Sequence, residues 1–157
     1  SISNLEWSFI LIMLDYLMWK MDVIIVKWNL DVVINPIAKK RKIDVVDYYK
    51  QDDILILHGQ KIIDNIKGIK TIIIGHSHPA IRLKNKIRSE MYKCFLKGSW
   101  MGKELIVMPS FNMLSVGTDV LEGNLLGPFM KQNIEDFEVY VVEDKVYKFG
   151  KIDRLRD

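Results

Sequence analysis

Short aliphatic runs alternate with polar turns along most of the chain. The longest apolar stretch, from Trp7 to Met21, has apolar residues at helical spacing. It follows Ser3 and Glu6, which have the spacing of a capping box. We therefore expect a helix that ends at Asp22 and is covered on more than one side. The next residues, 23–26, are β-branched and predict a fully buried strand.

The other aliphatic runs predict the remaining elements. In the first half, strands are expected at 43–48, 54–57 and 70–74, with a loop at 35–42 and a short helix at 60–66. In the second half, strands are expected at 80–83, 91–97, 104–108, 137–143 and 146–149. Hairpin turns are expected at 98–102 and 144–145, and a long irregular connection at 114–133. This order predicts an α/β fold (α+β layered), with a mostly buried sheet and an antiparallel extension packed onto it.

Composition and length indicate one globular domain over residues 1–157. The chain is 49% hydrophobic and 27% charged, and its net charge of +3 is too small to indicate nucleic-acid binding by itself. Cys94 is the single cysteine, which excludes an intramolecular disulfide and is typical of a reducing, cytoplasmic compartment. The N-terminal apolar stretch is shorter than the roughly 20 residues that a bilayer span needs. It also lacks the flanking features of a signal peptide, so no membrane association is expected.

Each of the three histidines ends an aliphatic run. His58 follows residues 54–57, and His76 and His78 follow residues 71–75. The carboxyl ends of buried strands are where open α/β folds place ligands, and two residues separated by one point the same way in an extended segment. A surface loop with two histidines, or a His58 bonded to the backbone, is the simpler interpretation. Together the three histidines favour a metal site, since imidazole suits zinc, iron and manganese.

Two motifs carry a resemblance to a known family. Gly75-His76-Ser77-His78-Pro79 and Leu57-His58-Gly59 resemble the motifs of calcineurin-like metallophosphoesterases. Residues 94–98 and 106–112 resemble the archaeal-type, ICC-like branch of putative phosphoesterases, and the resemblance extends from about Glu6 to Ile152. It implies a calcineurin-like sandwich and metal-dependent hydrolysis of phosphodiester or phosphomonoester bonds.

The resemblance also assigns a ligand set. The family's Gly-Asn-His-Asp segment corresponds here to Trp28-Asn29-Leu30-Asp31. Asn29 is thereby implied as a metal ligand, together with His58, His76 and His78. Leu30 replaces the family's catalytic histidine and cannot transfer a proton, which leaves Asp31 with no imidazole to orient.

Two further family motifs, Asp-x-His and Gly-Asp, do not occur in the sequence. We therefore expect a truncated copy of the fold that lacks its first strands. The family binds two metals. We expect at most one divalent metal here (Mn, Fe, Zn or Ni), on Asn29, His58 and His76, because His78 would be the only ligand left for the second metal. The expected hydrolysis is weak or absent.

Alternatives to a phosphoesterase remain open. A second hypothesis is a non-catalytic relic that acts as a binding or assembly module. In either case the truncated fold would be completed by self-association or by a separate N-terminal segment. A third hypothesis is nucleic-acid binding through the basic stretches 39–42 and 82–88.

Overall fold

The computed structural model describes residues 4–28, 34–84 and 88–156. The described chain is a mixed α+β structure, mostly sheet with two α-helices. It forms two compact units, Ser1–Val46 and Asp47–Asp157. No helix in the described ranges is long and apolar enough to cross a membrane.

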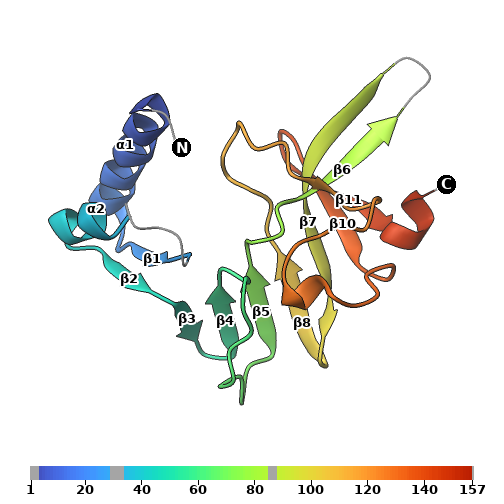
Figure 1. Cartoon of the computed structure of the whole chain (residues 1–157), viewed down its shortest axis with the longest axis horizontal. Coiled ribbons are helices and arrows are strands. Elements are labelled where there is room, and N and C mark those ends of the chain that lie inside the picture. Colours follow the sequence, from blue (N-terminus) through green and yellow to red (C-terminus); the bar gives the residue numbers. More distant parts are fainter. Residues whose placement is uncertain (1–3, 29–33, 85–87, 157) are drawn as a thin grey trace. The chain divides into compact units, whose positions relative to one another are not determined.

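The first unit contains two helices and a two-stranded parallel sheet (Figure 1). Its elements are α1 (Asn4–Lys20), β1 (Ile24–Val26), α2 (Ile34–Arg41) and β2 (Asp44–Val46). Leu14, Ala38 and Ile43 form its small core. Arg41 joins α2 to α1 by a two-pronged contact with Asp15, in which Nε lies 2.6 Å from Oδ1 and Nη2 lies 3.0 Å from Oδ2.

Several sequence expectations for this unit are wrong. The loop expected at 35–42 is mostly helix α2, because Pro36 lies in the first helical turn, where proline is tolerated, and Ala38 is buried against the core. Strand β1 is partly exposed rather than fully buried. The apolar surface of α1 is not covered on several sides either, since Phe9, Ile12 and Trp19 are 63%, 66% and 73% exposed. The helix itself is confirmed, and Ser3 lies outside the described residues.

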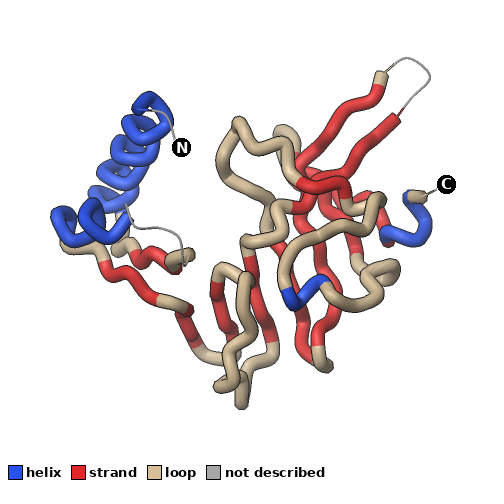
Figure 2. Tube along the Cα trace, viewed as in Figure 1, coloured by secondary structure: helices blue, strands red, loops and turns tan. Residues whose placement is uncertain are grey.

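The second unit is built around one large sheet (Figure 2). Hydrogen-bonded neighbours follow the order β11-β10-β7-β8-β5-β4-β3, and β6 pairs with both β7 and β9. Strands β4, β5 and β8 are parallel, and the other pairs on this path are antiparallel. The strands are β3 (Tyr48–Gln51), β4 (Ile54–Leu57), β5 (Thr71–Ile74), β6 (Pro79–Lys84), β7 (Ser89–Trp100), β8 (Lys103–Val107), β9 (Thr118–Asp119), β10 (Glu138–Val142) and β11 (Val146–Lys151). Two 3-10 helices, η1 (Pro128–Met130) and η2 (Ile152–Leu155), complete it.

The strands of this unit were largely predicted, but their assembly was not. Strand β8 lies beside β5, and β7 and β10 continue the same sheet, so the antiparallel part extends the sheet instead of packing onto it. The strand expected at 43–48 is divided into β2 and β3. Residues 60–66 form no helix; the backbone there makes short turns, such as the bond from the Ile69 N–H to the Ile66 carbonyl.

The turn expected at 98–102 is shorter than predicted. Strand β7 continues to Trp100, and only Met101 and Gly102 form the turn. Both have positive φ, at 50° and 73°, as a type I′ hairpin requires. Gly98 serves packing instead, because an added Cβ there would lie 2.2 Å from Cδ1 of the buried Phe137.

One face of the parallel strands is buried and the other is only partly covered. Leu55, Ile72 and Leu105 are fully buried, whereas their neighbours Ile56, Ile73 and Ile106 are half-buried. The expectation of a mostly buried sheet is therefore met on one face of β4, β5 and β8 and not on the other. The buried face packs against a core that includes Trp100 and Phe129, whose ring centroids lie 4.7 Å apart.

Candidate functional site

The three histidines lie at the carboxyl edge of adjacent parallel strands, as their sequence context predicted. Leu57 of β4 is in register with Ile74 of β5, so the residues that follow them meet at the same edge. The N–H of Gly75 donates to the carbonyl of His58 at 3.0 Å, which extends the pairing one step beyond the strands. A turn with two histidines is thereby fixed beside a third.

His58 and His76 are in direct contact. Nε2 of His58 lies 2.9 Å from Nδ1 of His76, and the two rings meet edge to face with centroids 4.9 Å apart. One nitrogen donates and the other accepts, so the two rings hold complementary tautomers. Two imidazole nitrogens on one tetrahedral zinc ion lie roughly 3.3 Å apart. A movement of a few tenths of an ångström therefore separates this pair from the spacing of two ligands of one metal.

His78 belongs to the same cluster but has an unexpected backbone conformation. Its φ of 45° lies in the left-handed region, and residues 76–77 form a turn rather than an extended segment. The expectation that His76 and His78 point the same way from an extended backbone therefore rests on the wrong geometry. The carbonyl of His78 accepts a hydrogen bond from the Thr118 N–H at 2.8 Å, which holds this uncommon conformation in place.

Burial and mutual repulsion keep the three imidazoles neutral. Burial, followed by the charges of His76 and His78, lowers the pKa of His58 to about 4. Burial also lowers the pKa of His76, and burial together with the nearby His76 and Lys93 lowers the pKa of His78. Metal binding requires the neutral ring, so these shifts keep ligand lone pairs accessible near neutral pH.

The long connection after β8 packs directly against the histidine turn. The buried hydroxyl of Ser77 donates to the Leu126 carbonyl at 2.7 Å. At the next residue, Gly127, an added Cβ would lie 3.0 Å from Cδ2 of His76. At Gly117 an added Cβ would lie 2.7 Å from the carbonyl oxygen of His78. Both glycines have positive φ, so glycine is required by conformation as well as by space.

The other candidate residues fall into two groups. Asn29, Leu30 and Asp31 lie outside the described residues. Over the described ranges, no three side chains of histidine, cysteine, aspartate or glutamate already surround a point that a metal ion would occupy. The structure thus brings His58 and His76 into contact and places His78 close by.

Sequence reasoning missed Lys93 as a residue of this region. Its ammonium group donates to the carbonyls of Ser110 at 2.7 Å and Asn112 at 2.5 Å, and burial lowers its pKa. Lys93 lies in β7 opposite Ala80, two residues after His78. The signal in the sequence is a lysine that interrupts the otherwise apolar run 91–96, between Tyr92 and Cys94.

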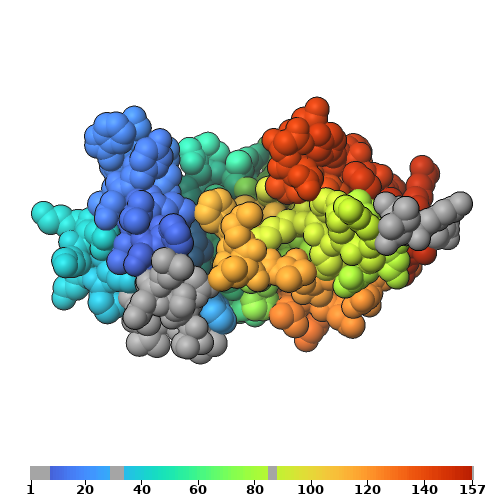
Figure 3. Space-filling model, turned by 90° about the horizontal axis from the view of Figure 1, so that it is seen from above, coloured from blue at the N-terminus to red at the C-terminus, as the bar shows by residue number. Residues whose placement is uncertain are grey.

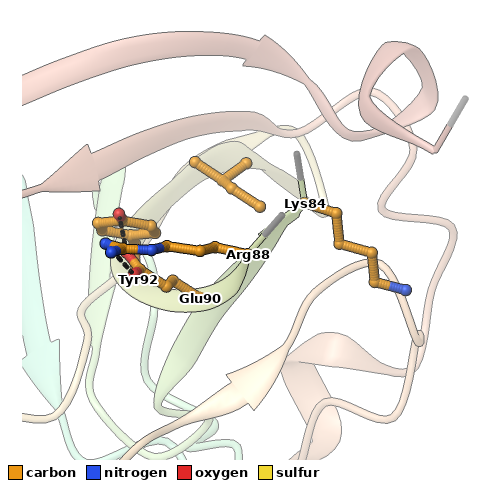
Figure 4. A pocket seen from close by; sticks show the side chains of 5 residues that line it. Lys84, Arg88, Glu90 and Tyr92 are labelled. Carbon is orange, nitrogen blue, oxygen red and sulfur yellow. Dashed lines mark hydrogen bonds and ion pairs between the residues drawn. The ribbon is translucent and has the colours of Figure 1, made fainter. Parts of the chain in front are cut away.

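A separate hollow lies on the β6–β7 hairpin (Figure 4). Leu83, Lys84, Arg88, Glu90 and Tyr92 line a cavity of about 260 Å³. Glu90 accepts a hydrogen bond from the Tyr92 hydroxyl at 2.6 Å and pairs with Arg88 at 4.0 Å. None of the histidines lines this hollow, and Glu90 is engaged with both Tyr92 and Arg88.

Comparison with known proteins gives no family assignment. No family model, no curated protein and no solved structure matches this chain.

Proposed function

We propose that this chain binds one divalent metal ion through His58 and His76, with His78 beside them, and uses it to bind and slowly hydrolyse phosphate esters. The calcineurin-like sandwich is the proposed fold. The observation that supports the proposal best is the 2.9 Å contact between Nε2 of His58 and Nδ1 of His76 at the carboxyl edge of β4 and β5.

The proposed chemistry divides between the metal and the chain. A divalent metal supplies Lewis-acid polarisation of the phosphoryl group and a lowered pKa of water. His58 and His76 would hold it with neutral rings, and the turn at His78 is fixed by Thr118. Leu30 offers no proton to the leaving oxygen, so slow turnover is expected, fastest with esters whose leaving group is already stable as an anion.

The test is metal binding followed by turnover. Titration calorimetry and elemental analysis of the purified chain are expected to give one manganese or zinc ion per chain. His58→Gln and His76→Gln should each lose that ion. A matched control is Asp52→Asn. Asp52 lies before the first residue of β4, at the end away from His58, so the substitution removes a carboxylate without touching the histidines. Two tightly bound metals per chain, or full affinity in His58→Gln, would contradict the proposal.

Turnover is measured with a chromogenic phosphodiester and added manganese. The wild-type chain should exceed the metal-only rate, and His58→Gln should not. Asp52→Asn should retain the wild-type rate.

Metal binding without any turnover would support the second candidate, a non-catalytic binding or assembly module. The observation that favours this candidate is the exposed apolar surface of α1, where Phe9, Tyr16 and Trp19 are all more than half exposed. The proposed location is the cytoplasm, which the free, buried thiol of Cys94 supports.

A further inference from the structure

The connection between β8 and β9 carries four exposed apolar side chains within residues 111–116. Phe111, Met113, Leu114 and Val116 are 84%, 89%, 72% and 63% exposed. In the space-filling view, the gold and orange part of the chain that contains them reaches the surface (Figure 3). Scattered apolar side chains on a surface are ordinary, but a contiguous group marks a site of interaction.

The backbone of this loop is held in place although its side chains are exposed. The ammonium group of Lys93 donates to the carbonyls of Ser110 and Asn112, which flank Phe111. The side-chain oxygen of Asn112 accepts the N–H of Leu114 at 2.9 Å, which closes a local turn. The exposed side chains are therefore displayed from a backbone with fixed anchor points, which lowers the entropy lost when a ligand binds.

Both ends of the loop are attached to the histidine turn. At its start, the Met108 N–H donates to the carbonyl of Ile74, the last residue of β5, at 2.7 Å. At its end, the Thr118 N–H donates to the carbonyl of His78 at 2.8 Å. The apolar loop is thereby a border of the histidine site, with the positive charge of Lys93 beneath it.

We propose that residues 110–116 bind the aromatic group of a phosphate ester whose phosphate is held at the histidine cluster. The inference rests on the proposed function and specifies its substrate class. An aryl phosphate matches both chemistries of the region, since its anionic end suits the histidine site and Lys93. Its ring suits Phe111 and Met113, because ring–ring and sulfur–ring contacts both favour aromatic ligands.

The experiment compares two non-hydrolysable probes on the manganese-loaded full chain. Phenylphosphonate and methylphosphonate share the charged group and differ only in the ring. Covering about half a ring on the loop gives roughly tenfold tighter binding of the phenyl compound. In the double variant Phe111→Ser and Met113→Ser, the affinity ratio measured by calorimetry should fall to about two or less, with methylphosphonate affinity unchanged.

The control variant is Met101→Ser. Met101 is 75% exposed at the β7–β8 turn. The substitution therefore removes a similar exposed apolar side chain at a place away from the histidines. It should keep the wild-type affinity ratio. An equal affinity for both probes in the wild type, a ratio unchanged in the double variant, or no phenylphosphonate binding at all would overturn the inference.

The outcomes also separate this inference from the proposed function. A chain that binds metal and inorganic phosphate but shows no preference for the phenyl probe retains the proposed function and loses the substrate class. A phenyl preference that depends on Phe111 and persists in His58→Gln contradicts the phosphoesterase site instead. A wild-type dimer by light scattering that the double variant turns into monomers would show that a second copy occupies the loop, which overturns the inference.

Discussion

Replacing Gly127 with alanine tests whether the connection after β8 shapes the histidine site. The substitution places a Cβ 3.0 Å from Cδ2 of His76 and 3.0 Å from the carbonyl oxygen of Gly59. Ordinary contacts of a Cβ begin near 3.4 Å, so the imidazole must move by a few tenths of an ångström. The Gly59 carbonyl belongs to the backbone and yields less readily than a side chain.

Two separate costs follow from this geometry. Gly127 has φ 98° and ψ 158°, a region almost restricted to glycine, so alanine costs about 1 to 3 kcal/mol of folding free energy. If His76 is a metal ligand as proposed, displacing it should lower metal affinity by about 10- to 100-fold, the range found when groups that orient metal ligands are removed. The first cost appears in stability and the second in metal binding.

Gly123 provides the control within the same connection. It also has positive φ, at 74°, but the nearest atom to an added Cβ is Nη2 of Arg156 at 4.0 Å. Gly123→Ala should therefore lower the unfolding free energy by about 1 kcal/mol and leave metal affinity unchanged. Urea unfolding in chelator measures the first quantity, and calorimetric titration with zinc measures the second. Wild-type affinity in folded Gly127→Ala, or an equal loss in Gly123→Ala, would refute the reasoning.

Three further predictions concern pH, packing and thiol reactivity. The pKa of His58 is about 4 in the folded chain against 6.5 when free, so the unfolded chain takes up a proton that the folded chain does not. The contribution of His58 to the unfolding free energy of the metal-free protein is therefore fully present above pH 6.5 and is lost as the pH falls toward 4. The difference corresponds to about 3 kcal/mol, which the half-exposed ring reduces to about 1 to 2 kcal/mol. His58→Gln should flatten this part of the curve in urea titrations at each pH, and an unchanged curve would contradict the assignment. Gly98→Ala forces the Phe137 ring to move and should cost about 1 to 3 kcal/mol, and Phe137→Leu should relieve most of that cost in a double-mutant cycle. Burial, assisted by the charge of Asp119, raises the pKa of Cys94 to about 12. The thiol should therefore react with a disulfide reagent only at the rate of unfolding. Fast labelling of the native chain would show that the thiol is accessible.

The position of the histidines was predictable because it depends on local patterns. An aliphatic run followed by histidine and glycine occurs at both 54–59 and 71–76, and both runs became parallel strands of one sheet. Parallel neighbours in register bring their carboxyl ends together, so the contact between His58 and His76 follows from two local patterns and one pairing.

Helix α2 was not predictable in the same way. Pro36 and the run of basic residues at 39–42 have the composition of a loop, and the helix is held by contacts outside its own segment. Ala38 is buried in the core of the first unit, and Arg41 donates a hydrogen bond to Asp15, which precedes it by 26 residues. Tertiary contacts of this kind override weak local propensity and leave little trace in a single sequence.

The border of the histidine site was missed for a related reason. Ser77 reaches Leu126 across 49 residues, and Lys93 reaches Ser110 and Asn112 across 17 and 19 residues. The sequence did contain glycines: Gly117 and Gly127 lie in the long connection after β8, directly before β9 and η1, at positions where a side chain would clash with the histidine turn. Glycines in a segment that follows a ligand motif therefore predict that the segment approaches that motif closely. Variants of the connection, rather than of the strands, then test whether the histidines form the proposed metal site or only a hydrogen-bonded pair. If the glycines serve only the turn, the metal affinity of Gly127→Ala will follow its stability; if they shape the ligand cluster, the two will separate.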